Sequence, residues 1–354
     1  MRLTLSQISL EVYRAGRTIG CWCHVPFPVT LVTAVDWGGS FMRGVSSVAG
    51  LLLVVICTIP VAADSTPFLG RWNLMSVGRE PTYVYWLEVK ERGGALTGRL
   101  LNRGGSPIPL REISVEGNEL IFRPASPGDR PSPEFRARIK DDELIGTVTE
   151  RGRTIEWIGR RPPRWGRADA NANHTFGPPV ELFDGRSLDA WDVQHKGQSS
   201  GWSVVDGAMT NQAKANNLVS KQQFTDFKIR AEYKLEAGSN SGIYLRGRYE
   251  LQVLDDHGKA VDSGGHMALY AWEAPRVNAS KLAGEWQTME ATLVGNRVTV
   301  TLNGQKVHDN LAIEAITGGA LDGDESRPGP IMLQGDHGTV WFRRVTVTPI
   351  GRTQ

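Results

Sequence analysis

The sequence predicts an all-β protein with two domains, a small up-and-down barrel followed by a two-sheet jelly-roll sandwich. Three observations lead to this prediction. Short segments in which polar and apolar residues alternate recur from Phe68 almost to the C-terminus. Turn-forming residues separate these segments, and the 354-residue chain holds 40 Gly and 19 Pro. Between residues 68 and 161, no segment shows the 3.6-residue period of an amphipathic helix.

The composition excludes several classes of protein. Hydrophobic residues make up 40% and charged residues 22%, which is typical of a globular rather than a disordered chain. The 40 basic and 38 acidic residues leave a net charge of +2, so no basic field indicates a nucleic-acid partner. Cys21, Cys23 and Cys57 all precede residue 64, and we expect neither disulfides nor cysteine-bound metals in the mature domains.

Residues 1–63 are predicted to precede the mature protein. We expect that the start of the sequence is assigned too early and that residues 42–63 form a signal peptide. That segment reads MRGVSSVAGLLLVVICTIPVAA, with one basic residue, a short apolar run and small residues before Asp64. The apolar run is short for a transmembrane helix. We therefore expect Met42 to be the true start and the mature protein to be extracytoplasmic, either periplasmic or secreted, without a stable membrane anchor. An uncleaved N-terminal anchor is the alternative.

Residues 66–162 are predicted to form the barrel. About eight strand patterns follow one another, and Tyr83, Tyr85 and Leu87 show the period of two. Consecutive antiparallel strands of this kind close most simply into a small barrel. Gly70 and Trp72 also resemble the G-x-W start of lipocalin-type barrels, in which the Trp fills the barrel base. A filled structural barrel is favoured over a ligand-holding one, and we expect no chemistry in this domain.

Residues 163–179 are rich in Pro, Ala, Asn and Gly and are predicted to be a linker. Residues 180–350 contain the strands of the second domain. The segment TLVGNRVTVTLNGQKV has two hairpin turns, Gly–Asn and Asn–Gly, and the latter is the strongest short-range hairpin signal. Antiparallel strands with long connections and no strong helix predict a jelly roll of two packed sheets.

Several sequence blocks of the second domain occur in a characteristic order: ELFDGRSLDAW, WSVVDGAM, SGIYLRG, YELQVLDD and GPIMLQGDHGTVWF. Together they resemble the 3-keto-disaccharide hydrolase family over about residues 180–350. The resemblance implies the concanavalin A-like, laminin-G-like jelly-roll fold. It also implies an enzyme that cleaves the glycosidic bond of a 3-keto sugar, by elimination and hydration, in some members with a divalent metal.

A keto group at C3 of a sugar makes the proton on C2 acidic. One base can then remove that proton, and the leaving group on C1 departs by elimination. The reaction needs a base near C2, a group that polarises the C3 oxygen and an acid for the leaving oxygen. It does not need the carboxylate pair of ordinary glycosidases.

The block YELQVLDD holds the first candidates for these roles. Glu250 and Gln252 are two residues apart and therefore share one face of a strand, whereas Asp255 joins them only if a β-bulge intervenes. The spacing E-x-Q-x-x-D partly resembles the E-x-D-x-x-E strand of laminarinase-type glycosidases. We predict Glu250 and Asp255 as acid/base groups, together with His266 or His337. Without the bulge, Glu250 must work with a histidine; a solvated face is the remaining alternative.

The neighbouring blocks supply candidates for binding. The predicted substrate-binding residues are Arg246, Gln252, Tyr270, Trp272 and Gln334. For Tyr270 and Trp272, packing within the fold is the alternative, and the family usually reads Q-D-H-G where this chain has an extra Gly335. The cofactor is unknown; one divalent metal is permitted, with Asp255, His257, Asp336 and His337 as candidate ligands, but no H-x-H pair indicates it.

The sequence therefore predicts an extracytoplasmic carbohydrate-active enzyme whose substrate is a 3-keto sugar or glycoside. A non-catalytic carbohydrate-binding module and an ordinary glycosidase are the alternatives, because this fold serves several functions. A catalytic domain should lose turnover and keep its fold in the Glu250→Gln variant. A binding module should lose only affinity, mainly on mutation of aromatic residues.

Overall fold

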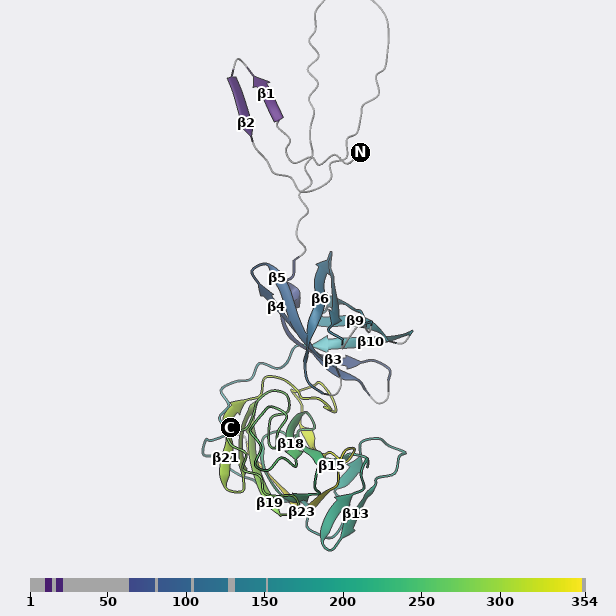
Figure 1. Ribbon diagram of the computed structural model, residues 1–354, viewed down its shortest axis with the longest axis vertical. Helices are drawn as coiled ribbons and strands as arrows, with labels where there is room; N and C mark the ends of the chain where they lie inside the picture. Colours follow the sequence, from purple (N-terminus) through teal and green to yellow (C-terminus); the bar gives the residue numbers. More distant parts are fainter. Residues whose placement is uncertain are drawn as a thin grey trace, which may run out of the picture. The chain divides into compact units, whose positions relative to one another are not determined.

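The computed structural model describes residues 10–14, 17–21, 64–79, 82–102, 105–126, 131–150 and 152–351 (Figure 1). The chain divides into two compact units, Met1–Ile59 and Pro60–Gln354, and each is described by itself. In the first unit, β1 (Leu10–Arg14) pairs antiparallel with β2 (Arg17–Cys21). The predicted signal peptide lies outside the described residues. Within the described part of the chain, no helix combines the length and hydropathy needed to cross a membrane.

The N-terminal part of the second unit is a closed antiparallel barrel, as predicted. A 3-10 turn, η1 (Thr66–Phe68), leads into it. The strand order around the barrel is β10-β3-β4-β5-β6-β7-β8-β9, so neighbours along the chain are neighbours in the sheet. The strands are β3 (Gly70–Ser76), β4 (Val84–Arg92), β5 (Ala95–Asn102), β6 (Ile108–Glu116), β7 (Glu119–Pro124), β8 (Phe135–Lys140), β9 (Glu143–Glu150) and β10 (Arg153–Arg160).

Side chains fill the barrel interior, in line with the favoured interpretation. Phe122 and Phe135 stack with ring centroids 4.7 Å apart, and both are fully buried with Trp157. Trp72 belongs to this core, and its indole N–H donates to the carbonyl of Phe68 at 2.9 Å. The many buried aromatic rings leave the interior as a packed core.

The C-terminal part is a sandwich of two antiparallel sheets, which confirms the predicted jelly roll (Figure 1). One sheet has the order β13-β14-β23-β16-β19-β20-β21, with β11 also paired to β23, and the other has the order β12-β15-β22-β17-β18. The strands of the larger sheet are β11 (Val180–Phe183), β13 (Trp202–Val205), β14 (Ala208–Asn211), β16 (Phe227–Leu235), β19 (Gln287–Val294), β20 (Arg297–Leu302), β21 (Gln305–Ala312) and β23 (Val340–Pro349).

The five-stranded sheet carries the candidate site. Its strands are β12 (Trp191–Val193), β15 (Leu218–Phe224), β22 (Gly329–Leu333), β17 (Asn240–Leu245) and β18 (Tyr249–Leu254). In β16 of the other sheet, buried and partly exposed residues alternate, as expected for a sheet with one wet face. In β17 and β18 nearly every residue is buried, because the core covers one face and loops cover the other.

The barrel packs against the sandwich through a few residues of the sandwich's hydrophobic core. Val84, Trp86 and Leu101 of the barrel belong to the same cluster of buried side chains as the interior of the sandwich. The predicted linker between them contains no helix or strand from residue 163 to 175. It is nevertheless fastened to the sandwich, since Asn171 Nδ2 donates to Asp309 Oδ1 at 2.6 Å.

Candidate functional site

A pocket of about 250 Å³ lies on the face of β17 and β18 that is turned away from the sandwich core. Glu250 and Gln252 of β18 and Tyr244 of β17 contribute side chains to it. Ile243 and Leu251, which alternate with them, belong to the core cluster on the opposite face. The period-two rule therefore explains why this strand pair has one polar and one apolar face.

The pairing register brings these polar side chains together. Tyr244 lies opposite Glu250 and Gly242 lies opposite Gln252 in the antiparallel ladder. A Cβ added to Gly242 would lie 2.5 Å from a carboxylate oxygen of Glu250. The glycine is therefore required for the space that the Glu250 side chain occupies. Glu250 and Gln252 are each only 4% exposed, so the alternative of a solvated face is wrong.

Burial is the main influence on the acidity of Glu250. It raises the pKa of Glu250 to about 8, because a buried carboxylate loses its hydration. A hydrogen bond from the Tyr244 hydroxyl lowers this pKa, and the negative charge of Asp336 raises it further. At neutral pH most of the Glu250 carboxyl is therefore protonated, as a general acid requires.

Tyr244 has one hydroxyl proton to share between two acceptors. Its hydroxyl donates to the carbonyl of Gly318 at 2.9 Å. While that proton is used in this bond, it is not available to the Glu250 carboxylate, and the hydrogen bond that lowers the pKa of Glu250 is lost. Burial and the nearby Glu250 also raise the pKa of Tyr244 well above its ordinary value, so the tyrosine stays neutral.

The turn that follows β22 carries an aspartate–histidine pair to the same pocket. Asp336 and His337 both line it, and His337 Nδ1 lies 2.7 Å from Asp336 Oδ1. A carboxylate that accepts from Nδ1–H leaves Nε2 as the basic nitrogen and orients the ring. Both side chains are about half exposed, so the histidine can exchange its proton with solvent.

Three predicted binding residues also lie in this pocket: Gln252, Tyr270 and Gln334. The backbone N–H of Tyr270 donates to Glu250 O at 3.1 Å, which ties its loop to the outer edge of β18. Gln334 Oε1 is buried, and among the described residues no group donates a hydrogen bond to it. A buried amide oxygen without a donor is costly, and a hydroxyl group bound in the pocket would satisfy it.

Asp255 does not join Glu250. The ladder between β17 and β18 runs without a register shift from Leu245↔Tyr249 to Asn240↔Leu254, so the bulge that Asp255 needs does not form. Asp255 lies just beyond the strand, where its Oδ2 accepts the backbone N–H of Gly238 at 2.8 Å. The open alternative, in which Glu250 works with a histidine, fits the position of His337.

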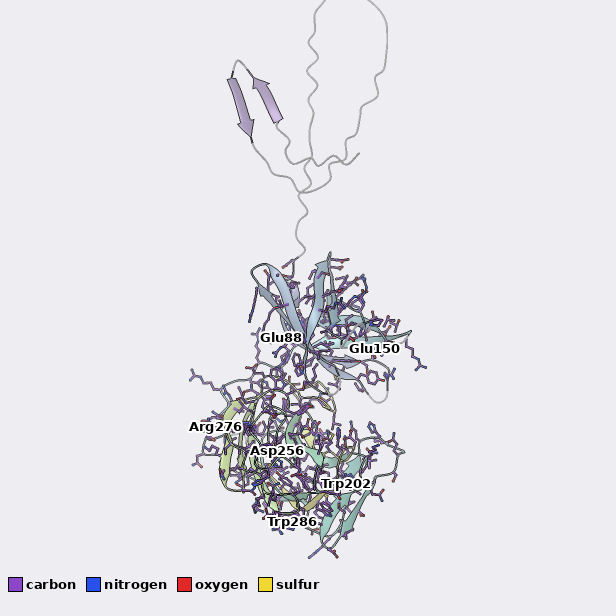
Figure 2. All side chains as sticks on the ribbon, in the orientation of Figure 1. Glu88, Glu150, Trp202, Asp256, Arg276 and Trp286 are labelled. Atoms are coloured by element: carbon purple, nitrogen blue, oxygen red, sulfur yellow. The ribbon has the colours of Figure 1, made fainter. Side chains whose placement is uncertain are left out.

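His266 is placed inside the sandwich rather than in the pocket. It is 2% exposed, and its Nε2 lies 2.7 Å from the hydroxyl of Tyr233. Its backbone N–H donates to Asp256, a buried residue labelled in Figure 2. Burial lowers the pKa of His266, so it stays neutral. The predicted catalytic role does not fit this packed position.

Two predicted binding residues lie elsewhere. Arg246 is 1% exposed, and its guanidinium donates to Asp226 Oδ1 at 2.8 Å, so it neither clamps a carbonyl in the pocket nor neutralises Glu250. Trp272 packs its ring against Trp86 of the barrel, with centroids 5.3 Å apart, instead of lining the pocket. In both cases the fold uses the large side chain for packing.

The four predicted metal ligands do not converge. His257 Nδ1 lies 2.6 Å from Ser280 O, and Asp255 accepts a hydrogen bond from the turn at Gly238. Of the four candidate ligands, only Asp336 and His337 are therefore in contact with each other. Among the described residues, no three His, Cys, Asp or Glu side chains form a group that could hold a metal ion. These residues do not fit a metal centre.

Several residues of the pocket were not predicted from the sequence. Tyr244 could have been found, because it follows Gly242 by two residues and must face the same way. Gly318 and Gly319 come from a loop without any pattern of its own, and Gly105 comes from the barrel. No short-range signal connects these positions to β18.

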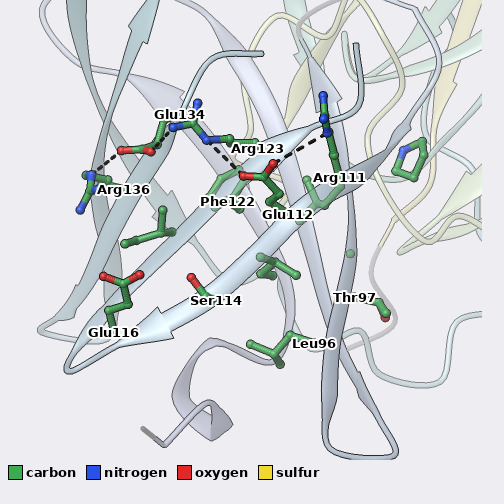
Figure 3. A pocket seen from close by; sticks show the side chains of 15 residues that line it. Leu96, Thr97, Arg111, Glu112, Ser114, Glu116, Phe122, Arg123, Glu134 and Arg136 are labelled. Atoms are coloured by element: carbon green, nitrogen blue, oxygen red, sulfur yellow. Dashed lines mark hydrogen bonds and ion pairs between the residues drawn. The ribbon is translucent and has the colours of Figure 1, made fainter. Parts of the chain in front are cut away.

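A second hollow of about 770 Å³ lies in the barrel wall between β5 and β6 (Figure 3). The two strands pair only at Arg99↔Pro109 and Leu100↔Ile108, so the wall opens beyond these positions. Its charged side chains neutralise one another; Figure 3 shows Arg123 between Glu112 and Glu134, and it forms ion pairs with both. Arg123 is therefore already paired with carboxylates in this hollow.

Comparison with known proteins yields one family match. The model of the 3-keto-alpha-glucoside-1,2-lyase-like domain matches residues 178–348. No curated protein matches the chain. Among solved structures, a candidate glycosyl hydrolase from Parabacteroides distasonis shares 30% identity, over 48% of this chain and 82% of that one, with a TM-score of 0.42.

Two further structures show lower identity. A second candidate glycosyl hydrolase from the same organism shares 21% identity over 49% of this chain and 94% of that one, with a TM-score of 0.43. A carbohydrate-binding module from Bacillus subtilis shares 13% identity over 44% of this chain and 94% of that one, with a TM-score of 0.33.

Proposed function

Because the chain belongs to the 3-keto-alpha-glucoside-1,2-lyase-like domain family through residues 178–348, we propose that it cleaves the glycosidic bond of 3-keto-glycosides. Family membership makes it a glycosyl hydrolase-like, carbohydrate-active protein. The observation that carries this proposal is a pair of groups in one pocket: the protonated carboxyl of Glu250 and the imidazole of His337, which Asp336 orients. A protonated carboxyl and an imidazole nitrogen in one pocket can serve as the acid and the base.

The first half of the reaction is an elimination. His337 Nε2 takes the proton from C2, and the electron pair of the C2–H bond forms an enolate with the C3 carbonyl. The enolate then reforms the C3 carbonyl as the C1–O bond breaks and a C1=C2 double bond forms. Glu250 gives its proton to the leaving oxygen. A carbonyl at C3 is essential, since without it the C2 proton is not acidic.

The second half adds water across the same double bond. The ionised Glu250 takes a proton from water as its oxygen attacks C1, and the protonated His337 returns a proton to C2. Both residues end in their starting states, and the sum of the two halves is hydrolysis. Gln252, Tyr270 and Gln334 line the pocket and supply hydrogen-bonding groups for sugar hydroxyls.

The test measures release of sugar from a chemically 3-oxidised disaccharide and from its unoxidised parent, each with and without EDTA. We expect cleavage of the oxidised substrate only, unaffected by EDTA. Cleavage of the parent alone would refute the keto-sugar proposal and support an ordinary glycosidase. Tight binding of sugar without any turnover would instead support a carbohydrate-binding module.

The variant Glu250→Gln keeps the size of the side chain and removes its proton-transfer ability. We expect kcat to fall by about 10² to 10⁴ with an unchanged fold. The matched control is Asp255→Asn, which removes a neighbouring carboxylate that lies outside the pocket. It should keep wild-type activity, and equal losses in both variants would contradict the assignment of Glu250.

A further inference from the structure

A side chain of the barrel binds directly to a loop that lines the pocket. Trp86 of β4 is fully buried, and its indole N–H donates to the carbonyl of Ile316 at 3.1 Å. We call residues 316–319 the wall loop, because Gly318 and Gly319 line the pocket. The barrel thus reaches the site through one hydrogen bond that spans 230 positions of sequence.

The wall loop in turn forms hydrogen bonds with both Glu250 and Tyr244. Thr317 Oγ1 accepts the backbone N–H of Glu250 at 2.9 Å. The carbonyl of Gly318 accepts the hydroxyl proton of Tyr244 at 2.9 Å. The residue that Trp86 binds, Ile316, directly precedes these two. A displacement of Ile316 would therefore alter the hydrogen bonds that orient Glu250 and Tyr244.

Further contacts connect the barrel to the sandwich at this point. The Trp86 ring packs against Trp272, with centroids 5.3 Å apart, and Trp272 lies two residues from the pocket residue Tyr270. The buried carboxylate of Glu325 forms a second link: it accepts Asn73 Nδ2 of β3 at 2.7 Å and the hydroxyl of Tyr249 at 2.8 Å. Gly105 of the barrel also lines the pocket itself.

From these contacts we infer that the barrel is part of the active site, and that Trp86 is a positioning residue for the acid Glu250. The inference rests on the proposed function for its kinetic readout. It assigns a role to a domain in which the sequence shows no chemistry. The chemistry stays in the sandwich, and the barrel determines where the wall loop lies.

A displacement of the wall loop should change the acidity of Glu250 in one direction. The groups that face Glu250 are Tyr244 on β17, Tyr270 on the loop beside β18, and Asp336 and His337 on the turn after β22. Of these, Tyr244 is directed by the wall loop. If Gly318 O moves away, the Tyr244 hydroxyl can donate to the Glu250 carboxylate, which favours the ionised form and lowers the pKa of Glu250. The alkaline limb of the pH–rate profile then moves to lower pH.

The experiment compares Trp86→Phe with Trp157→Phe in the full-length protein. Trp157 is also a fully buried indole of the barrel, but its N–H has no hydrogen-bond partner among the described residues and it lies in the barrel interior. Both variants lose similar ring area. We expect kcat on the 3-oxidised disaccharide to fall about 10- to 100-fold in Trp86→Phe, with the alkaline limb at lower pH. Trp157→Phe should keep the wild-type pH–rate profile when the folded fractions of the two variants are equal.

Direct titration of the Glu250 carboxyl by carbon NMR provides a readout that does not need turnover. A lower pKa in Trp86→Phe than in Trp157→Phe supports the inference, even if the wild-type protein cleaves no 3-keto sugar and the proposed function fails. Identical titrations in the two variants overturn the inference, whatever the substrate. Thermal unfolding of both variants shows whether each remains folded at the assay temperature.

Discussion

The buried acid Glu250 should lower the stability of the protein at neutral and alkaline pH. Its ordinary pKa is 4.5, and burial raises its pKa to about 8 in the folded state. The folded state therefore binds this proton more tightly than the unfolded state does. The free energy of unfolding is unaffected below pH 4.5, falls as the pH rises from 4.5 to about 8, and stays reduced above that.

The size of the effect follows from the difference between the two pKa values, about 3.5. Each whole pKa difference corresponds to about 1.4 kcal/mol, so the full penalty is about 5 kcal/mol above pH 8 and about 3 kcal/mol at pH 7. Glu250→Gln keeps the shape of the side chain without a titrating proton. The variant should therefore be more stable than the wild type by these amounts, while it loses activity.

Urea unfolding of both proteins from pH 4 to 9, monitored by tryptophan fluorescence, measures this difference directly. The two unfolding free energies should be close at pH 4.5 and diverge as the pH rises. Because other groups titrate equally in both proteins, their contributions cancel in the difference. A difference that stays constant across this range would refute a raised pKa for Glu250, and with it the assignment of Glu250 as a protonated acid at neutral pH.

Two further predictions concern other parts of the chain. Gly105 has a φ of +86° and lines the pocket, so Gly105→Trp should fill the cavity and raise KM for a disaccharide at least tenfold. Gly105→Ala carries the same backbone strain of about 1 kcal/mol and should leave KM unchanged. Equal KM values in the two variants would show that Gly105 of the barrel does not line the substrate pocket. N-terminal sequencing of the protein recovered outside the cytoplasm should begin near Asp64, and recovery of intact residues 1–41 would contradict the proposed start at Met42 and the cleaved signal.

The fold was largely predictable because its signals are local. Alternation in β4 and β16 and the Asn–Gly turn between β20 and β21 are properties of short segments, and each agrees with the observed strand. The all-β class and both architectures follow from such segments. The order of strands within the sandwich does not, since β22 lies between β15 and β17 although the chain reaches it much later.

The candidate site was only partly predictable. The shared face of Glu250 and Gln252 follows from the period of two, and so does the separation of Asp255 once no bulge intervenes. Arg246, His266 and Trp272 were misplaced because large side chains of these types also serve as packed, hydrogen-bonded interior groups. Their spacing in the sequence is the same in either role.

The sequence by itself determined which residues share a strand face, because side-chain alternation is a property of the extended backbone. The tertiary structure alone decided which groups meet across that face. The pairing of β22 with β17 brings the turn with Asp336 and His337 to Glu250. The contact of Trp86 with Ile316 joins the barrel to the wall loop. Both depend on the packing of segments that are far apart in the sequence, and no local pattern specifies which distant segments meet.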